Sequence, residues 1–542
     1  MPKSVSGEAG LASSAGKSTL ASRIEKSLLL RIVLSVTGGA LLAFSFPDVS
    51  AGPLVFIGLA PLIIAVVLSR SLTEAFFQAT GGTMVTWLIN LPWVIKVMSY
   101  YGGLAYPVGV AIYIALALAL GVFAGVFFGL PVRALRLGAR PLPWMLVPAA
   151  WVAVELARTY LLSGFPWHQL AAAIIDLTPL VQLTSIIGPY GVGFFIAVPS
   201  TFIAWALISR PPRREVILSA SAVVMMLVVW TGWGMWAVRV QDSRIEAEAK
   251  SRAALLQPNI SQEMRWGASS VAELFIRMEE MTIDAIRQGA DVVVWPESTI
   301  PLTYARTDVF RESVESASRG GIVGRDGTAT PPADIILGSV AEDPEDPSKL
   351  WNAAYLVSGG KTAGRYDKIR LVPFGEYVPL KEMLFFAEKL VRAVGDFQFG
   401  ENENPLQGTF RYGPAICYEV VYPQITRTQI LNGAEVLVTI TNDGWFGGTA
   451  APRQHLNMAR LRAVEGDRYL LRAATTGISA LVDPAGRLVQ SLDENRQGTL
   501  MVEFSPRKTM TMYMRIGDSL AFVSVAALVL ALALKMRRRV SS

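Results

Sequence analysis

Long apolar runs without charge are the feature that most restricts how this 542-residue chain can fold. A helix of about 20 predominantly apolar residues is long enough to cross a bilayer. Eight runs of roughly that length occur, near residues 28–46, 52–69, 76–95, 105–130, 143–162, 188–208, 216–237 and 517–534. The sequence therefore predicts a multi-span helical membrane domain of about eight transmembrane helices.

Lys and Arg residues cluster in alternate loops between these runs, while the loops 46–52 and 99–106 contain none. Basic residues mark the cytoplasmic ends of transmembrane helices. The clusters comprise Lys17, Arg23, Lys26, Arg70, Arg133, Arg136, Arg140, Arg210, Arg213, Arg214, Lys535, Arg537, Arg538 and Arg539. Because seven runs precede the polar segment, that segment is predicted to lie outside the cytoplasm. Membrane topology also explains the net charge of +6, so no nucleic-acid partner is expected.

Four regions follow from this pattern. Residues 1–27 are predicted to be a cytoplasmic tail without stable structure, and 28–238 a membrane domain with seven transmembrane helices. Residues 239–512 form the extracytoplasmic domain, and 513–542 supply the eighth transmembrane helix and a basic cytoplasmic tail.

The extracytoplasmic segment alternates between strand and helix patterns, which is typical of an α/β sandwich. Predicted strands cover 252–257, 291–298, 334–341, 352–359, 366–371, 411–419 and 434–443, and a hairpin covers 479–490. Predicted helices cover 271–289 and about 453–472.

Cys417 is the only cysteine in the chain and follows an apolar strand pattern. Two other predicted strands end near Glu297 and Lys368. A carboxylate can take the thiol proton, an ammonium can stabilise a thiolate and an oxyanion, and the backbone N–H after the cysteine can complete an oxyanion hole. A cysteine, a glutamate and a lysine are therefore the residue types that acyl transfer through a thioester requires. A cysteine–histidine pair with His455 stays open, and a lone cysteine is more often a small buried apolar residue.

Several motifs resemble the nitrilase superfamily with its Glu-Lys-Cys triad and, within it, the apolipoprotein N-acyltransferases. They are WPES at 295–298, YDKIRLVPFGEYVP at 366–379, CYE at 417–419 and TNDGWFG at 441–447, with QPNISQEMRW at 257–266 as the opening strand. The resemblance covers nearly the whole chain, including the membrane part. It implies a nitrilase-like α-β-β-α sandwich for residues 239–512.

The resemblance implies that Cys417 is the nucleophile, Glu297 the general base and Lys368 the stabiliser of the oxyanion. Glu376 corresponds to a supporting acid. Tyr418 and Glu419 correspond to supporting residues that follow the nucleophile.

Trp266 corresponds to a tryptophan on an arm over the cavity and is expected to contact lipid. No cofactor is implied, and no spacing of metal ligands occurs in the sequence.

The implied reaction is a two-step acyl transfer in lipoprotein maturation. A phospholipid, typically phosphatidylethanolamine, would acylate the cysteine, and the N-terminal amine of diacylglyceryl-cysteine in an apolipoprotein would take the acyl chain. The resemblance implies a membrane-integral protein of the bacterial inner membrane, with the catalytic domain on the periplasmic side, and we expect a monomer.

Two alternatives belong to other functional classes. A membrane-tethered carbon–nitrogen hydrolase, such as an amidase, would use the same triad with water in place of the amine. A scaffold or transporter without catalysis would place the function in the membrane part and would leave the Glu-Lys-Cys set unexplained.

Overall fold

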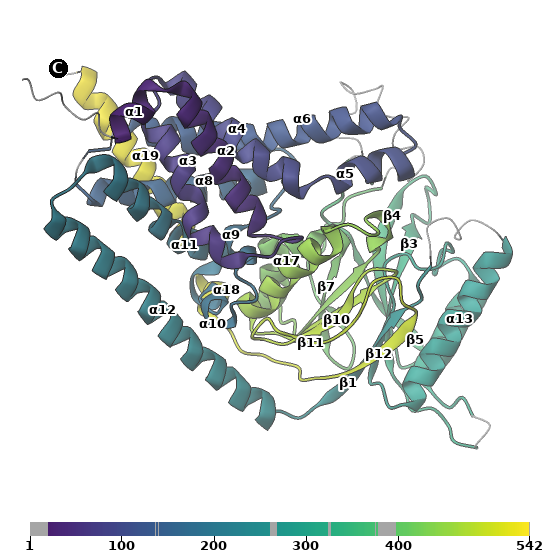
Figure 1. Cartoon of the computed structure of the whole chain (residues 1–542). Coiled ribbons are helices and arrows are strands. Elements are labelled where there is room, and N and C mark those ends of the chain that lie inside the picture. Colours follow the sequence, from purple (N-terminus) through teal and green to yellow (C-terminus); the bar gives the residue numbers. More distant parts are fainter. Residues whose placement is uncertain are drawn as a thin grey trace, which may run out of the picture.

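The computed structural model describes residues 20–135, 137–138, 140–260, 268–323, 327–373, 375–377 and 397–540. Two parts are evident, a bundle of apolar helices and an α/β sandwich that packs against one end of it (Figure 1). The long helix α12 (Arg213–Ala247) leads from the bundle to the first strand of the sandwich, β1 (Ser251–Gln257). Residues Leu20–Lys26, which the sequence assigns to the tail, form a short helix, α1.

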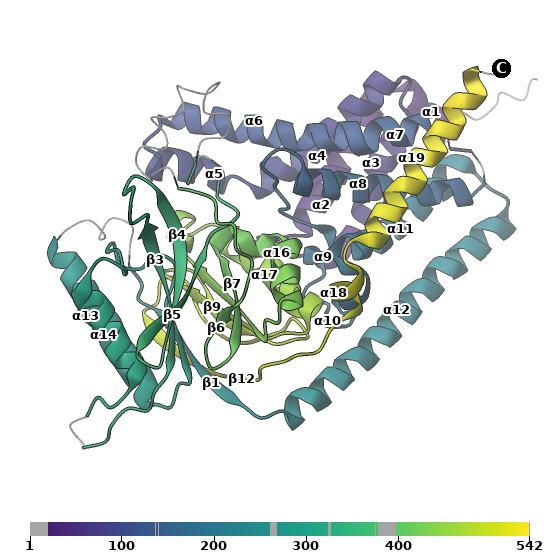
Figure 2. The ribbon, with the colours of Figure 1, turned by 180° about the vertical axis from the view of Figure 1, so that it is seen from behind.

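The bundle is built by helices from both ends of the chain, because α19 returns to it after the sandwich (Figure 2). Its longer helices are α2 (Leu28–Phe44), α3 (Val55–Val67), α4 (Leu72–Asn90), α6 (Tyr106–Ala124), α8 (Leu146–Tyr160), α11 (Thr184–Ser209), α12 and α19 (Ser519–Val540). Short helices lie between them: α5 (Trp93–Lys96), α7 (Leu130–Ala134), α9 (Leu170–Ala173) and α10 (Thr178–Val181). Another, α18 (Met512–Ile516), lies between the sandwich and α19.

The prediction of eight transmembrane helices is corrected by helix length and polarity. Four helical segments in the described part of the chain are long and apolar enough to cross a membrane: Tyr106–Ala134, Thr184–Ser209, Arg213–Ala247 and Ser519–Arg538. A fifth is counted if α1 and α2, which meet at 102°, are taken as one bent span. Helices α3 and α8 have 13 and 15 residues, which at 1.5 Å per residue is short of a bilayer core of about 30 Å.

Polar side chains inside the bundle explain why α4 also falls short in hydropathy. Glu74 on α4 pairs with Arg31 of α2 at 2.6 Å, and Gln78 accepts a hydrogen bond from Ser35 at the same distance. These groups are satisfied by partners from a neighbouring helix, which lowers the cost of burying them.

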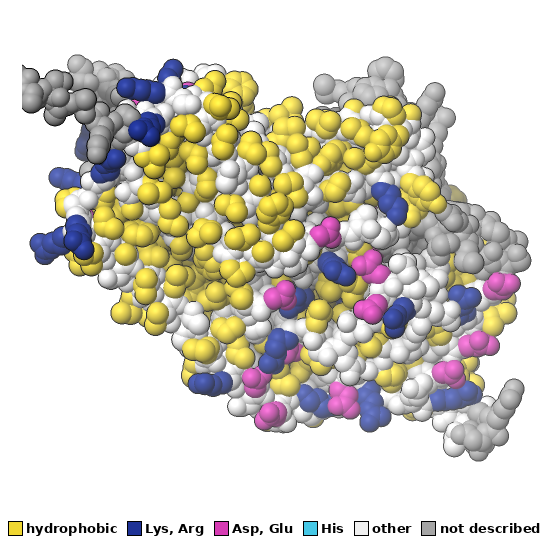
Figure 3. Space-filling model, in the orientation of Figure 1, with side chains coloured by type: hydrophobic (Ala, Val, Ile, Leu, Met, Phe, Trp, Pro, Cys, Tyr) yellow, Lys and Arg dark blue, Asp and Glu magenta, His cyan; other side chains and the backbone are white. Residues whose placement is uncertain are grey.

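The outer surface differs in polarity between the helical bundle and the sandwich. Hydrophobic side chains cover the helical bundle almost continuously, whereas charged side chains of both signs are scattered over the sandwich (Figure 3). Lys and Arg gather at the far end of the bundle, near the end of α19. An apolar belt of this kind is expected of a surface that faces lipid.

The sandwich contains two six-stranded mixed sheets, with strand orders β12-β1-β2-β3-β4-β5 and β11-β10-β9-β8-β7-β6. In the first, β2 (Val292–Val294) lies parallel to β1 and β3 (Asp334–Glu342), and β4 (Leu350–Ser358), β5 (Lys361–Asp367) and β12 (Gly498–Phe504) are antiparallel to their neighbours. In the second, β7 (Arg411–Ile416), β8 (Val436–Thr441) and β9 (Leu470–Ala474) are parallel, and β6 (Leu406–Gln407), β10 (Ser479–Val482) and β11 (Leu488–Leu492) are antiparallel.

Helices cover both outer faces, which confirms the expected α-β-β-α layering. Apolar side chains such as Val294, Ile336, Val438 and Ile440 fill the space between the sheets. Helices α13 (Ala268–Arg287) and α14 (Asp308–Arg319) cover the first sheet.

Helices α16 (Pro423–Leu431) and α17 (Ala451–Gly466) cover the second sheet on the side of the bundle (Figures 1 and 2). One apolar core runs from the membrane helices into this layer and includes Tyr422, Met458 and Leu461. The helix predicted over 453–472 ends earlier than expected, because Asp467 has a left-handed backbone and β9 begins at Leu470.

Candidate active site

The three residues predicted to form the triad lie at strand ends that meet at one edge of the sandwich. Lys368 directly follows β5, Glu297 lies three residues after β2, and Cys417 directly follows β7 of the opposite sheet. The Lys368 ammonium lies 3.4 Å from Glu297 Oε1. All three side chains are buried. The two sheets therefore contribute opposite walls of one polar site.

The Glu297 carboxylate is held by donors from three different segments. Its Oε1 accepts hydrogen bonds from Asn352 Nδ2 at 2.7 Å and from Lys368 Nζ, while Oε2 accepts one from the backbone N–H of Asn442 at 2.9 Å. Asn442 belongs to the TNDGWFG motif. Such contacts fix the orientation of a carboxylate.

Lys368 is bound between two carboxylates. Its Nζ also donates to Glu376 Oε1 at 3.0 Å, and the other oxygen of Glu376 accepts from the backbone N–H of Val372 at 2.8 Å. Burial lowers the pKa of Lys368, but the charges of Glu376 and Glu297 outweigh burial and raise the pKa above its ordinary value. The ammonium group therefore stays charged at neutral pH.

The Cys417 thiol is buried at the start of a 3-10 turn, Cys417–Val421. Its φ of 51° lies in the left-handed region, which few residues other than glycine adopt. Burial and the charge of Glu297 raise the pKa of the thiol above its ordinary value, although Lys368 opposes this shift. The thiol is therefore protonated at neutral pH and would need a base before it could attack. Glu297 and Asp443 are carboxylates whose charges raise its pKa.

Glu419 connects the end of β7 to the residues that follow Lys368. Its Oε2 accepts from the N–H of Ile416 at 2.7 Å, and its Oε1 accepts from the N–H groups of Ile369 and Arg370 and from the Tyr366 hydroxyl. The side chain is fully buried, and burial raises its pKa to about 7. These contacts place Glu419 behind the site as a positioning group.

Tyr418 connects the site to the membrane domain. Its hydroxyl donates to the carbonyl of Gly164 at 3.1 Å, and the hydroxyl of Tyr422 donates to the same carbonyl at 3.0 Å. Its ring lies close to Phe165 and Trp167 in the same loop. Trp266, the remaining predicted site residue, lies outside the described residues.

His455 contacts the backbone of Cys417. Its Nε2 lies 3.0 Å from the carbonyl oxygen of Cys417, which can only accept, so Nε2 carries a hydrogen. Burial and the charge of Arg472 lower the pKa of His455 and outweigh the opposing effect of Asp443, whose Oδ1 lies 3.3 Å from Nδ1, so the ring is neutral at neutral pH. The free lone pair is then on Nδ1, which accepts from Arg472 Nη2 at 3.1 Å. This arrangement argues against the cysteine–histidine pair, because neither ring nitrogen is available to the thiol.

The sequence patterns did not single out two buried polar residues at the site. Asn352 donates to both Glu297 and Glu376, each at 2.7 Å. Asp443 lies within hydrogen-bond distance of both Arg472 and His455 in a fully buried cluster. Asparagine is depleted in strands, so an asparagine inside a buried strand was the available signal for Asn352.

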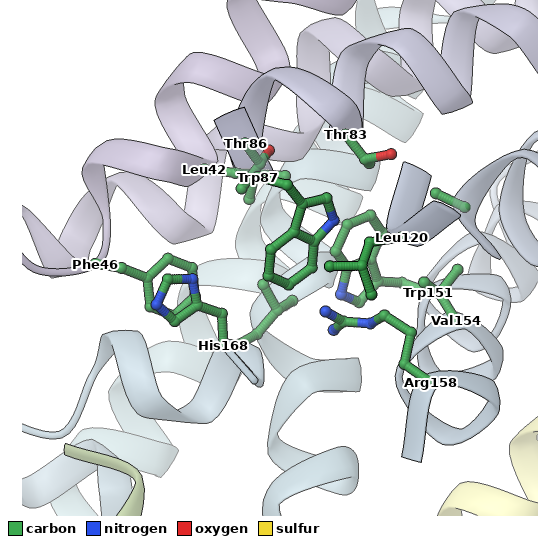
Figure 4. A pocket seen from close by; sticks show the side chains of 12 residues that line it. Leu42, Phe46, Thr83, Thr86, Trp87, Leu120, Trp151, Val154, Arg158 and His168 are labelled. Carbon is green, nitrogen blue, oxygen red and sulfur yellow. The ribbon is translucent and has the colours of Figure 1, made fainter. Parts of the chain in front are cut away.

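A cavity of about 20 Å³ lies in the membrane bundle, apart from the polar site. His168 stacks on Phe46, with ring centroids 4.1 Å apart, and the Arg158 guanidinium lies over Trp87 at 4.8 Å (Figure 4). The volume corresponds to about one water molecule.

Two family models match separate parts of the chain. Residues 252–511 match the family described as carbon-nitrogen hydrolase. Residues 38–202 match the family described as apolipoprotein N-acyltransferase N-terminal domain. The chain therefore combines a carbon-nitrogen hydrolase domain with the membrane domain of a specific acyltransferase family.

Curated relatives extend this similarity over nearly the full length. An apolipoprotein N-acyltransferase from Geobacter metallireducens is 33% identical over 94% of this chain and 95% of its own. Another from Methylococcus capsulatus is 31% identical over 94% of this chain and 97% of its own. Among solved structures, a mutant of a Nesterenkonia amidase from the nitrilase superfamily is 21% identical, with a TM-score of 0.37, over 50% of this chain and 96% of that chain. On the sequence relationships, this chain belongs to the apolipoprotein N-acyltransferase family.

Proposed function

We propose that this enzyme transfers a fatty acyl chain from a phospholipid to the N-terminal amine of a diacylated apolipoprotein, through a thioester on Cys417. The observation that carries the proposal is the position of the chain's only cysteine. Cys417 lies at a strand end within electrostatic range of Glu297 and Lys368, and the next residue, Tyr418, touches the membrane domain. A buried acyl-transfer site is thus joined to a part of the protein that contacts lipid.

In the first half-reaction, Glu297 takes the thiol proton as Cys417 Sγ attacks an ester carbonyl of the phospholipid. Lys368 and the backbone N–H of Tyr418 stabilise the tetrahedral oxyanion. Collapse breaks the ester C–O bond, and the lysophospholipid leaves with the proton returned by Glu297. Glu376 and Asn352 hold the two charged groups in position.

In the second half-reaction, the α-amine of diacylglyceryl-cysteine attacks the thioester. Glu297 takes a proton from the attacking amine, the C–S bond breaks, and the proton goes to the leaving thiolate. The products are the N-acylated lipoprotein and the free thiol. The same base thus serves both steps, which suits a ping-pong sequence.

The proposed donor is phosphatidylethanolamine, and the proposed location is the bacterial inner membrane with the sandwich on the periplasmic side and the enzyme as a multi-pass monomer. The gathering of Lys and Arg at the end of the bundle away from the sandwich supports this orientation (Figure 3). The proposed site residues are Cys417, Glu297 and Lys368 for catalysis and Glu376, Tyr418, Glu419 and Trp266 in support. The proposed domain limits remain 1–27, 28–238, 239–512 and 513–542.

Intact-protein mass spectrometry after incubation with phosphatidylethanolamine tests the proposal. The native enzyme should gain one fatty-acyl mass that hydroxylamine removes, and Cys417→Ser should show no hydroxylamine-sensitive adduct. A diacylated lipopeptide should discharge the adduct and appear as a triacylated product. Release of free fatty acid without acylation of the lipopeptide would favour the membrane-tethered hydrolase, and a folded native enzyme that gains no acyl mass would contradict the proposal.

A further inference from the structure

Two consecutive residues of α17 connect the membrane domain to the nucleophile. Gln454 and His455 are both buried, with 1% of each exposed. Gln454 contacts the membrane domain, whereas His455 contacts the backbone of Cys417. The pair therefore spans the junction between the two parts of the molecule.

The side-chain amide of Gln454 uses its full hydrogen-bonding capacity on the membrane domain. Its Nε2 donates to the carbonyls of Pro47 and Asn90 at 2.9 and 3.0 Å. Its Oε1 accepts from the indole N–H groups of Trp93 and Trp167 at 3.3 and 3.0 Å. An amide offers two hydrogens and two lone pairs, so these partners fix its position and, with it, the start of α17.

The His455 ring is held from three sides. Nε2–H donates to the carbonyl of Cys417, Nδ1 accepts from Arg472, and the ring stacks on Trp167 with centroids 6.0 Å apart and planes inclined by 19°. Trp167 also donates to Gln454. The same membrane-domain side chain therefore positions both residues of the pair.

A fixed carbonyl at Cys417 also fixes the next backbone N–H. The peptide bond between Cys417 and Tyr418 is trans. In a planar trans peptide the C=O and N–H bonds point in opposite directions. When His455 holds the carbonyl on one side, the Tyr418 N–H is directed to the other.

We propose that His455 is a positioning residue for the oxyanion hole, and that the contacts of Gln454 and Trp167 let the docked membrane domain set this position. The inference rests on the proposed acyl transfer, in which the Tyr418 N–H binds the oxyanion. His455 takes no proton and does not touch the substrate. Its function is to keep one peptide plane in the orientation that the tetrahedral intermediate requires.

The test compares His455→Gln with His455→Asn in the full-length enzyme. The Gln amide nitrogen is three bonds from Cβ, as Nε2 is in histidine, so Gln can donate to the Cys417 carbonyl. The Asn amide nitrogen is one bond closer to Cβ and replaces Nδ1 instead. We expect Asn to lower the rate of acyl-thioester formation from phosphatidylethanolamine by about 10- to 100-fold at saturating lipid, with KM unchanged, and Gln to restore most of the rate.

The rate at which iodoacetamide alkylates Cys417 distinguishes a role in positioning the oxyanion hole from a role in packing alone. This reaction forms no oxyanion, so its rate should stay within about twofold of the native rate in both variants, and the melting temperatures should stay close to native. Native acylation in His455→Asn, or equal impairment of both variants, overturns the inference. A parallel loss of acylation, alkylation and thermal stability also overturns it, because His455 would then act through packing alone. Absence of acylation in the native enzyme would instead contradict the proposed function.

Discussion

Replacing Asn352 with aspartate tests how the buried charges of the site are balanced. The Asn352 amide donates to Glu297 Oε1 and Glu376 Oε1, both at 2.7 Å, and Lys368 contacts the same two oxygens. Aspartate has nearly the same shape as asparagine but has no N–H group. The substitution therefore adds a third carboxyl group to two glutamates that share one ammonium.

The size of the effect follows from Coulomb repulsion. Two unit charges about 4 Å apart repel by about 4 kcal/mol at an effective dielectric constant of about 20. This repulsion opposes a third carboxylate, so in the variant the introduced aspartate carboxyl should keep its proton to a higher pH than an exposed aspartate does. A protonated carboxyl donates one hydrogen bond where asparagine donates two, and a lost bond to a charged group costs about 1.5–3 kcal/mol.

If the lost hydrogen bond stabilises the transition state, the acylation rate decreases by about 10- to 150-fold at neutral pH. Raising the pH removes the extra proton and leaves a third negative charge, so the rate of the variant relative to the native enzyme should decrease further between about pH 6 and 9. Intact-protein mass spectrometry across this range measures both rates. Asn402→Asp is the matched control, because Asn402 is exposed and its oxygen, which aspartate keeps, accepts from the N–H of Asn404. A native rate in Asn352→Asp, or a relative rate that rises with pH, would refute the reasoning.

Two further predictions concern the same site. Gly338→Ala should lower the melting temperature and the acylation rate, because an added Cβ would lie 2.7 Å from Glu297 Cα and from the Ser298 nitrogen. Such overpacking costs about 1–3 kcal/mol. The control is Gly81→Ala, where the added Cβ has nothing within 4 Å, and equal melting temperatures of the two variants would contradict the prediction. The rate of Cys417 alkylation in the lipid-free enzyme should rise about tenfold per pH unit between about pH 7 and 9, because burial raises the thiol pKa and only the thiolate reacts; a plateau below pH 9 would show that the pKa is not raised.

The sequence predicted the architecture well wherever a local pattern carries the information. Apolar runs marked the helices of the bundle, and β-branched runs marked strands such as β2 and β8. The number of spans was wrong because an apolar run does not fix how much of it becomes helix: α3 and α8 have only 13 and 15 residues within the predicted runs 52–69 and 143–162.

The candidate site was predictable only where its residues occupy positions that a local pattern marks. Glu297, Lys368 and Cys417 stand at strand ends, a local feature, and the structure brings them together. The positions of Asn352 and His455 depend on contacts across sheets and layers, such as the backbone bond from Lys368 N–H to the Asn352 carbonyl at 2.8 Å. No local pattern encodes such a contact, so their roles required the structure.

The apolar core that continues from the bundle into α16 and α17 links the folding of the two parts. A fragment that begins at β1 would leave Tyr422, Met458 and Leu461 facing water, so cutting the chain after α12 should yield an aggregating fragment instead of a soluble enzyme. In synthesis, β1 emerges long before its partner β12, more than 200 residues later. The first sheet can therefore close only after almost the whole chain has been synthesised, which makes this interval the stage of biogenesis most exposed to proteases and to aggregation.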